Sequence, residues 1–140
     1  MNSLLLEAKQ KRKFVSPDLQ IQSWEDVKPY FDQLVSFNID SETAMKNFLA
    51  FRSELEAVLS EEMSWRYIKM TCDTTNDSLR ESFNTFVTEI DPEISKYSNV
   101  LDKKCLENPY FQNLDGDYLI MKRALRQREA LFREENVPLI

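Results

Sequence analysis

The chain has 140 residues, which fits one domain, and its 42% hydrophobic and 30% charged residues are an ordinary globular balance. Its net charge of −6 argues against binding to nucleic acid or to an anionic membrane, and its single glycine disfavours the sandwiches, barrels and nucleotide-binding folds that need several. Because histidine is absent, the sequence excludes Ser-His-Asp and Cys-His nucleophiles, H-E-x-x-H zinc sites and Glu-x-x-His di-iron bundles.

Residues 1–22 are polar and mixed, with a turn signal at Pro17 and Asp18. We expect them to form a partly ordered lead-in to a helical domain that spans residues 23–140. Four apolar residues of the lead-in are expected to dock onto the core: Phe14, Val15, Leu19 and Ile21. The first residues do not form a signal peptide, because their charges follow the short apolar run, and no stretch approaches the about 18 apolar residues of a membrane span. A reducing cytoplasm is the expected compartment.

The next two elements are predicted to be amphipathic helices. Ser23 and Asp26 form a capping-box pattern that starts the first helix, which should end near Phe37 and which Pro29 should kink or displace. The second helix should start at the D-S-E-T sequence and continue to about Met70. Its apolar stripe has three- and four-residue steps: Met45, Phe48, Leu49, Leu55, Val58, Leu59, Met63 and Trp65.

The polar run C-D-T-T-N-D should stop the second helix and cap the third, because such side chains compete for backbone hydrogen bonds. The third helix has the clearest periodicity in the chain: Leu79, Phe83, Phe86, Val87, Ile90, Ile94, Tyr97, Leu101 and Cys105. Asp91 and Pro92 interrupt it, but the stripe keeps its phase. We therefore expect one kinked helix that ends at Asn108 and Pro109.

A loop with the only glycine should lead into a basic helix from Asp117 to Arg133. Its inward residues are expected to be Tyr118, Met121, Leu125 and Phe132. Its cations are Lys122, Arg123, Arg126, Arg128 and Arg133. They are interpreted either as a solvated or internally paired face, or as a contact for phosphate or an acidic peptide. Together these elements predict an all-α fold, a bundle of long antiparallel amphipathic helices joined by short polar turns.

Two further groups have both a structural and a functional interpretation. Four acidic residues are expected to form a solvated face and not a metal site, since no histidine accompanies them: Glu54, Glu56, Glu61 and Glu62. Cys72 has no catalytic partner and is expected to be a small buried thiol, although Lys69 and Arg66 lie close in sequence. The role of Cys105 stays open. The residues alone indicate a helical domain without a self-contained active site.

Three segments carry a family resemblance. They are R-K-F-V-S-P-D-L-Q-I-Q-S-W-E-D-V-K-P-Y-F (12–31), R-S-E-L-E-A-V-L-S-E-E-M-S-W-R-Y-I-K-M-T-C-D-T-T-N (52–76) and L-F-R-E-E-N-V-P-L (131–139). In this order they resemble the N-terminal region of oligoendopeptidase F-type zinc metallopeptidases, relatives of thimet oligopeptidase. The resemblance implies a mostly helical enzyme with a deep channel between two halves. The catalytic half would bind zinc through H-E-x-x-H and a downstream Glu and hydrolyse short peptides.

The chain stops before any zinc ligand, so the resemblance implies an N-terminal domain or fragment that forms part of the channel wall. It would have no catalytic residue or metal ligand of its own, and zinc would belong to the full-length enzyme. Its partners would be short peptides and the C-terminal catalytic domain, and an exposed apolar face could also pair two copies. The alternative is a stand-alone helical protein-interaction module without catalysis.

The corner between the second and third helices holds the candidate substrate-channel residues. Arg66, Tyr67, Asp73 and Asn76 could position the backbone or the termini of a peptide in the complete enzyme. In the alternative interpretation, the corner only caps helices and packs Tyr67 and Met70 inward.

Overall fold

The structure is a computed structural model that describes residues 12–114, 116 and 118–134, with side chains through residue 131. Its elements in chain order are α2 (Trp24–Val35), α3 (Glu42–Cys72), α4 (Asp77–Thr85), the π-helical turn η1 (Phe86–Ile90), α5 (Asp91–Glu107), α6 (Pro109–Gln112) and α7 (Tyr118–Glu134). The described residues contain no strand, so the predicted all-α class is confirmed.

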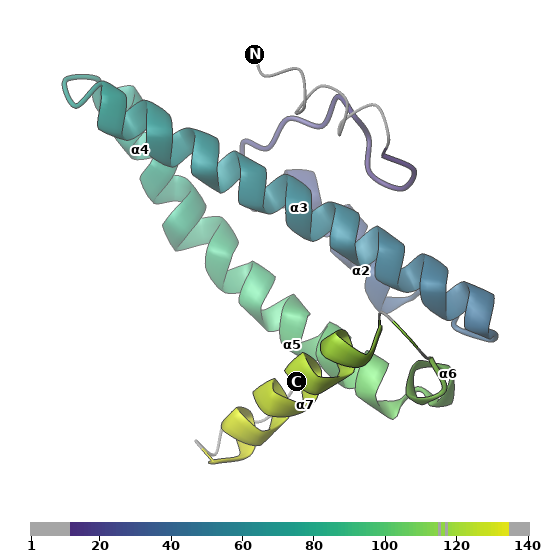
Figure 1. The fold of residues 1–140 in the computed structure, drawn as a ribbon. Helices are drawn as coiled ribbons and strands as arrows, with labels where there is room; N and C mark the ends of the chain where they lie inside the picture. Colours follow the sequence, from purple (N-terminus) through teal and green to yellow (C-terminus); the bar gives the residue numbers. More distant parts are fainter. Residues whose placement is uncertain (1–11, 115, 117, 135–140) are drawn as a thin grey trace.

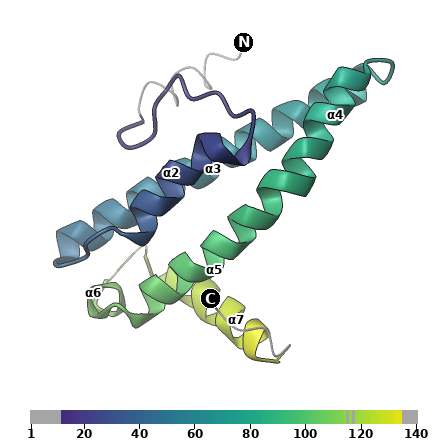
Figure 2. The ribbon, with the colours of Figure 1, turned by 180° about the vertical axis from the view of Figure 1, so that it is seen from behind.

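The elements form an open helical hairpin with smaller helices packed along it (Figure 1). α3 runs one way, and the rod made of α4, η1 and α5 returns antiparallel to it, diverging from α3 with distance from the corner. α2 packs against both α3 and α5, and α7 lies obliquely on α5 (Figure 2). The hairpin and α2 therefore enclose the core on one side and leave a cleft between α3 and α5 on the other.

α2 and α3 begin at the residues that the sequence indicates. The capping box predicted at Ser23 is formed, because Asp26 Oδ2 accepts from the backbone N–H of Ser23 at 3.0 Å. α2 passes through Pro29 and ends at Val35, slightly earlier than predicted. Ser41 caps α3 by accepting from the N–H of Ala44 at 3.0 Å. With 31 residues, α3 is about 46 Å long at the standard rise per residue.

The rod after the corner is helical through Pro92, as predicted, and the irregularity that accommodates the proline is η1. The N–H of Asp91 donates to the carbonyl of Phe86, five residues back, which is the π-helical pattern. Pro92 has no N–H, and in a regular helix its ring would clash with the carbonyl of Thr88. The wider turn, which includes Thr88, relieves that clash. Of the predicted stripe, Phe86 and Ile90 are buried, whereas Val87 is exposed.

The end of α2 is capped by a side chain from α5. Lys104 Nζ donates to the carbonyls of Leu34, Val35 and Phe37 at 3.0, 2.6 and 2.7 Å. It also lies 5.4 Å from the ring centroid of Phe48, and burial lowers the pKa of the Lys104 ammonium. A lysine therefore satisfies the carbonyls that many helices leave to a C-terminal glycine.

The connection to α7 is more helical than predicted. Part of the expected loop forms the short helix α6, which Asn108 caps by accepting from the N–H of Tyr110 at 2.9 Å. Gly116 has a φ of 67°, in the left-handed region that glycine adopts most easily. Asp117, the predicted start of the last helix, lies outside the described residues, as do the side chains of Phe132 and Arg133.

The core is one cluster of buried apolar residues between the hairpin and α2. Its largest fully buried side chains include Phe31, Phe48, Phe86 and Phe111. From the lead-in, Val15 and Ile21 are buried, while Phe14 and Leu19 pack against the cluster as expected. Residues 1–11 lie outside the described residues.

The apolar stripe of α3 leaves the core earlier than predicted. Met63 still packs against the cluster, but Trp65, Tyr67 and Ile68 are exposed. The reason is geometric: α3 extends beyond α2, and near the corner α4 is the helix that packs against it.

Candidate functional site

The corner between α3 and α4 is held by its own polar side chains. Asp73 Oδ1 accepts from the N–H and the hydroxyl of Thr75 at 3.2 and 2.8 Å. Asn76 Oδ1 accepts from the N–H groups of Ser78 and Leu79 at 3.1 and 3.4 Å, which caps α4. The predicted end of one helix and start of the next at this polar segment is confirmed. The side chain of Asp73 stabilises the turn, and that of Asn76 caps α4.

Arg66 joins three segments beneath the corner. Its Nε donates to Glu62 Oε1 at 3.1 Å, its Nη1 donates to the carbonyl of Ser82 at 3.1 Å, and its Nη2 donates to the carbonyl of Ile21. Its guanidinium also lies 5.2 Å from the ring centroid of Phe86. The side chain is almost fully buried, so it fixes the lead-in and α4 to α3.

The remaining corner residues point outward. Tyr67 is 53% exposed and makes a tilted contact with Phe83, at 5.7 Å between ring centroids, so the inward packing that the alternative interpretation gives it is wrong. Cys72 is exposed, so its expected burial is also wrong. Arg66 points inward, whereas Tyr67, Asp73 and Asn76 are exposed.

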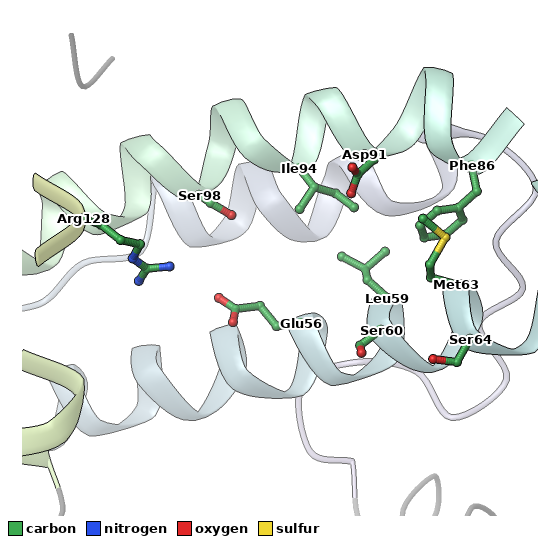
Figure 3. Close-up of a pocket in the computed structure, with 10 residues that line it drawn as sticks. All are labelled: Glu56, Leu59, Ser60, Met63, Ser64, Phe86, Asp91, Ile94, Ser98 and Arg128. Carbon is green, nitrogen blue, oxygen red and sulfur yellow. The ribbon is translucent and has the colours of Figure 1, made fainter. Parts of the chain in front are cut away.

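A cleft of about 320 Å³ lies between α3 and the η1–α5 segment (Figure 3). Its apolar wall comprises Leu59, Met63, Phe86 and Ile94. Its hydroxyl groups come from Ser60, Ser64 and Ser98, and its charged residues are Glu56, Asp91 and Arg128. The cleft thus combines an apolar wall with hydroxyl groups and with charges of both signs.

A buried ion network closes the Arg128 end of the cleft. Asp102 Oδ1 accepts from Arg52 Nη2 at 2.5 Å and from Arg128 Nη2 at 3.1 Å. Arg52 Nε also donates to Glu56 Oε1 at 2.7 Å. Burial alone would lower the pKa of Arg52, but the charges of Asp102 and Glu56 and their hydrogen bonds raise it above its ordinary value. The guanidinium is therefore charged at every physiological pH.

Cys105 lies beside this network. Its Sγ is 4.0 Å from Arg52 Nη1, and burial raises the pKa of the thiol to about 11 despite the nearby cation. The thiol is therefore neutral near pH 7, which makes it a packing group and a poor nucleophile.

Arg52 and Asp102 are not among the predicted site residues, although their positions in the sequence carry a signal. Arg52 lies four residues after Phe48 and three before Leu55, inside the apolar stripe of its helix. Asp102 follows Leu101 in the stripe of the facing helix. Opposite charges on the buried faces of two antiparallel helices indicate a buried ion pair.

The acidic cluster of α3 is partly exposed, as expected of a solvated face, and each of its carboxylates also pairs within the molecule. Glu54 accepts from the N–H groups of Lys13, Phe14 and Val15, with a shortest distance of 2.9 Å to Phe14. Glu61 pairs with Arg12 at 3.6 Å. Glu56 and Glu62 pair with Arg52 and Arg66. These carboxylates anchor the lead-in and the arginines of α3.

Three cations of the basic helix α7 are paired within the molecule, as one of the two interpretations predicted. Lys122 Nζ donates to the carbonyls of Gln112, at 2.7 Å, and Leu114. Arg126 donates to Gln112 Oε1 at 2.8 Å, and Arg128 pairs with Asp102. These contacts fasten α7 to α6 and α5.

The profile of the family described as peptidase M3 N-terminal domain matches residues 14–125. The chain belongs to the peptidase M3 N-terminal domain family. The match covers both walls of the cleft in this M3 domain and ends three residues before Arg128. The predicted likeness to the N-terminal region of an M3-type, thimet oligopeptidase-like metallopeptidase is confirmed. Comparisons with curated proteins and with solved structures found no match.

Within residues 12–114, 116 and 118–134, no group of three or more His, Cys, Asp or Glu side chains is placed to hold a metal ion. These residues therefore do not fit a zinc site. In the same ranges, no helix has both the length and the apolar character needed to cross a membrane.

Proposed function

We propose that this M3 domain forms part of the peptide-channel wall of a zinc-dependent oligoendopeptidase whose catalytic residues lie in another part of the enzyme. The observation that carries the proposal is the family match over both helices that form the cleft. Because the described residues do not fit zinc, the contribution assigned to this chain is peptide binding and steric exclusion. We also infer a cytoplasmic enzyme, since its two cysteines are free thiols.

The lining of the cleft suits an extended peptide. A strand presents backbone N–H and C=O groups at intervals of about 3.4 Å, and rotatable hydroxyls act as donors or acceptors for both. Ser60 and Ser64 are one helical turn apart, about 6 Å, on the α3 side, and Ser98 lies on the α5 side. Side chains of the peptide would contact Leu59 and Ile94, which lie between the serines of the two walls.

The corner residues have a separate place in this proposal. Tyr67, Asp73 and Asn76 are exposed at the far end of the hairpin and remain proposed contacts for peptide entering the channel. The proposed role of Arg66 is to fix the position of this corner, because its guanidinium bonds to three segments of the chain.

A matched pair of substitutions on α5 tests the channel role in the complete peptidase. Ser98→Tyr fills the cleft, whereas Ser95→Tyr places the same side chain at an exposed position one turn away that does not line it. We expect Ser98→Tyr to lower kcat/KM for short peptides at least tenfold, mainly through KM, and Ser95→Tyr to change it less than twofold. Equal kinetics for the two variants would show that peptides do not use the cleft.

The isolated 140-residue chain provides a second test. Because the described residues do not fit zinc, we expect the chain to leave peptide bonds intact. Hydrolysis by the chain alone, removed by a chelator, would contradict the assignment of catalysis to another region.

Exposed apolar residues on α7 favour a contact with another protein surface. Ile120 is 78% exposed and Leu131 is 55% exposed, and both lie on the outward face of the helix. We propose that this face packs against the catalytic region of the same enzyme. Pairing of two copies through α7 is disfavoured, because Arg123 and other cations would face one another. If the chain instead forms a concentration-dependent dimer that Ile120→Glu abolishes, the face binds a second copy of the chain. That result would favour the stand-alone interaction module.

A further inference from the structure

We infer that the Arg128 end of the cleft binds a peptide carboxylate, so that the cleft receives peptides in one direction. This inference rests on the proposed function, in which the cleft admits peptides. It adds a chemical group that the ligand must carry and names the residue that recognises it.

Arg128 is held in a defined orientation toward the cleft. Asp102, whose side chain is 3% exposed, accepts from Arg128 Nη2 at 3.1 Å and is itself fixed by Arg52. A guanidinium carries five N–H donors in a planar fork, so one contact to Asp102 leaves donors for a second carboxylate. Figure 3 shows the guanidinium directed into the cleft, and the side chain is 49% exposed. The group is both preorganised and accessible.

The charges around Arg128 balance, so an incoming carboxylate would bind through the remaining donors of its guanidinium. Two guanidiniums, of Arg52 and Arg128, face two carboxylates, of Asp102 and Glu56, which leaves the network close to neutral. Glu56 lies across the cleft, but its Oε1 already accepts from Arg52 Nε at 2.7 Å, which offsets its charge. A ligand with one carboxylate can therefore replace water at Arg128 and form a charge-assisted hydrogen-bonded pair.

The opposite end of the cleft sets the direction of the ligand. Asp91 is exposed there, on the far side of Ile94 from Ser98 and Arg128. Its negative charge repels a carboxylate and attracts an ammonium group. A peptide would therefore place its carboxylate at Arg128, its apolar side chains on Leu59 and Ile94, and its amino-terminal side toward Asp91.

The test is a titration of the 140-residue chain with three tetrapeptides, followed by amide chemical shifts of the ¹⁵N-labelled protein. The first is Ala-Leu-Ala-Phe with a free carboxylate, and the second is its carboxamide. The third is the carboxamide of Ala-Leu-Ala-Glu, which carries its carboxylate on a side chain. We expect the first to shift the amides of the cleft and to bind at least tenfold more tightly than the second. Tight binding of the third would assign the site to any peptide carboxylate, and weak binding would restrict it to the C-terminus.

Variants separate Arg128 from the general charge of α7. Arg128→Gln should bind acid and amide equally, and Arg128→Lys should keep part of the preference. Arg123→Gln, an exposed arginine on the same helix that does not line the cleft, should bind as the unmodified chain does. Equal binding of acid and amide with shifts in the cleft would overturn the carboxylate inference and leave the channel proposal standing. Absence of peptide binding would also overturn the inference. The channel role is tested separately by the kinetics of Ser98→Tyr and Ser95→Tyr in the complete peptidase.

Discussion

Replacing Asp102 by asparagine tests the buried network that closes one end of the cleft. The substitution keeps the size of the side chain but removes the charge that lies 2.5 Å from Arg52 and 3.1 Å from Arg128. Breaking a buried ion pair typically costs about 3–5 kcal/mol, because the remaining charge stays away from water. Arg52 keeps Glu56 at 2.7 Å and the carbonyl of Ser98 at 3.5 Å, and Arg128 is half exposed. We therefore expect a loss near the lower limit, about 3 kcal/mol.

Urea unfolding followed by far-UV circular dichroism measures this loss, with an unchanged slope as the sign that only stability has altered. For a domain of this size, about 3 kcal/mol corresponds to a decrease in Tm of about 10 °C. The double variant Arg52→Met/Asp102→Leu removes both buried charges and should cost less than Asp102→Asn alone. Arg128→Gln should cost less than about 1 kcal/mol, because that pair is half exposed. A loss below about 1 kcal/mol for Asp102→Asn, or a double variant as unstable as the single one, would refute the reasoning.

Three further outcomes are expected. Lys104→Met should cost about 1–3 kcal/mol in urea unfolding, because the carbonyls of Val35 and Phe37 lose this donor while that of Leu34 keeps the N–H of Phe37. A cost no larger than that of Lys103→Met, at an exposed neighbouring position, would contradict this. Hydrogen bonds from two backbone N–H groups lower the pKa of Asp26 below its ordinary 3.8, so its contribution to stability is present above that pH and lost as the pH falls through the folded pKa. Asp26→Asn should therefore flatten the acid side of a curve of stability against pH. An unchanged acid side would count against the cap. A disulfide reagent at pH 8 should modify exposed Cys72 in the folded chain and Cys105, with its pKa of about 11, only after unfolding; equal rates would disprove its burial.

The parts of the fold that the sequence predicts depend on signals a few residues apart. Ser41 caps α3 through an N–H three residues on, and Asn76 caps α4 through N–H groups two and three residues on. Helical periodicity likewise showed that the rod is continuous through Pro92. It did not reveal η1, because a π-helical turn differs from an α-helical one in its backbone hydrogen bonds, which the spacing of apolar side chains does not report.

The parts that were missed depend on partners far apart in the chain. Glu54 was assigned to a solvated face, yet it accepts from backbone N–H groups 39 to 41 residues earlier. Trp65 continues the stripe of α3 but is exposed, because periodicity marks the face of a helix and not where its neighbour ends. The cleft has the same origin, since the divergence of α3 from α5 is a property of packing that neither helix carries in its own sequence.

The ammonium of Lys104 makes the completion of α2 dependent on a distant part of the chain. The carbonyls it satisfies lie 67 to 70 residues earlier, so the last turn of α2 finds this donor only after α5 has docked. Lys104 therefore cannot stabilise the last turn of α2 before α5 is in place. The amide hydrogens of that turn should exchange together with those in the core of α5. Because a lysine of α5 replaces a local glycine cap, α2 and the α5 arm of the hairpin should unfold as one cooperative unit.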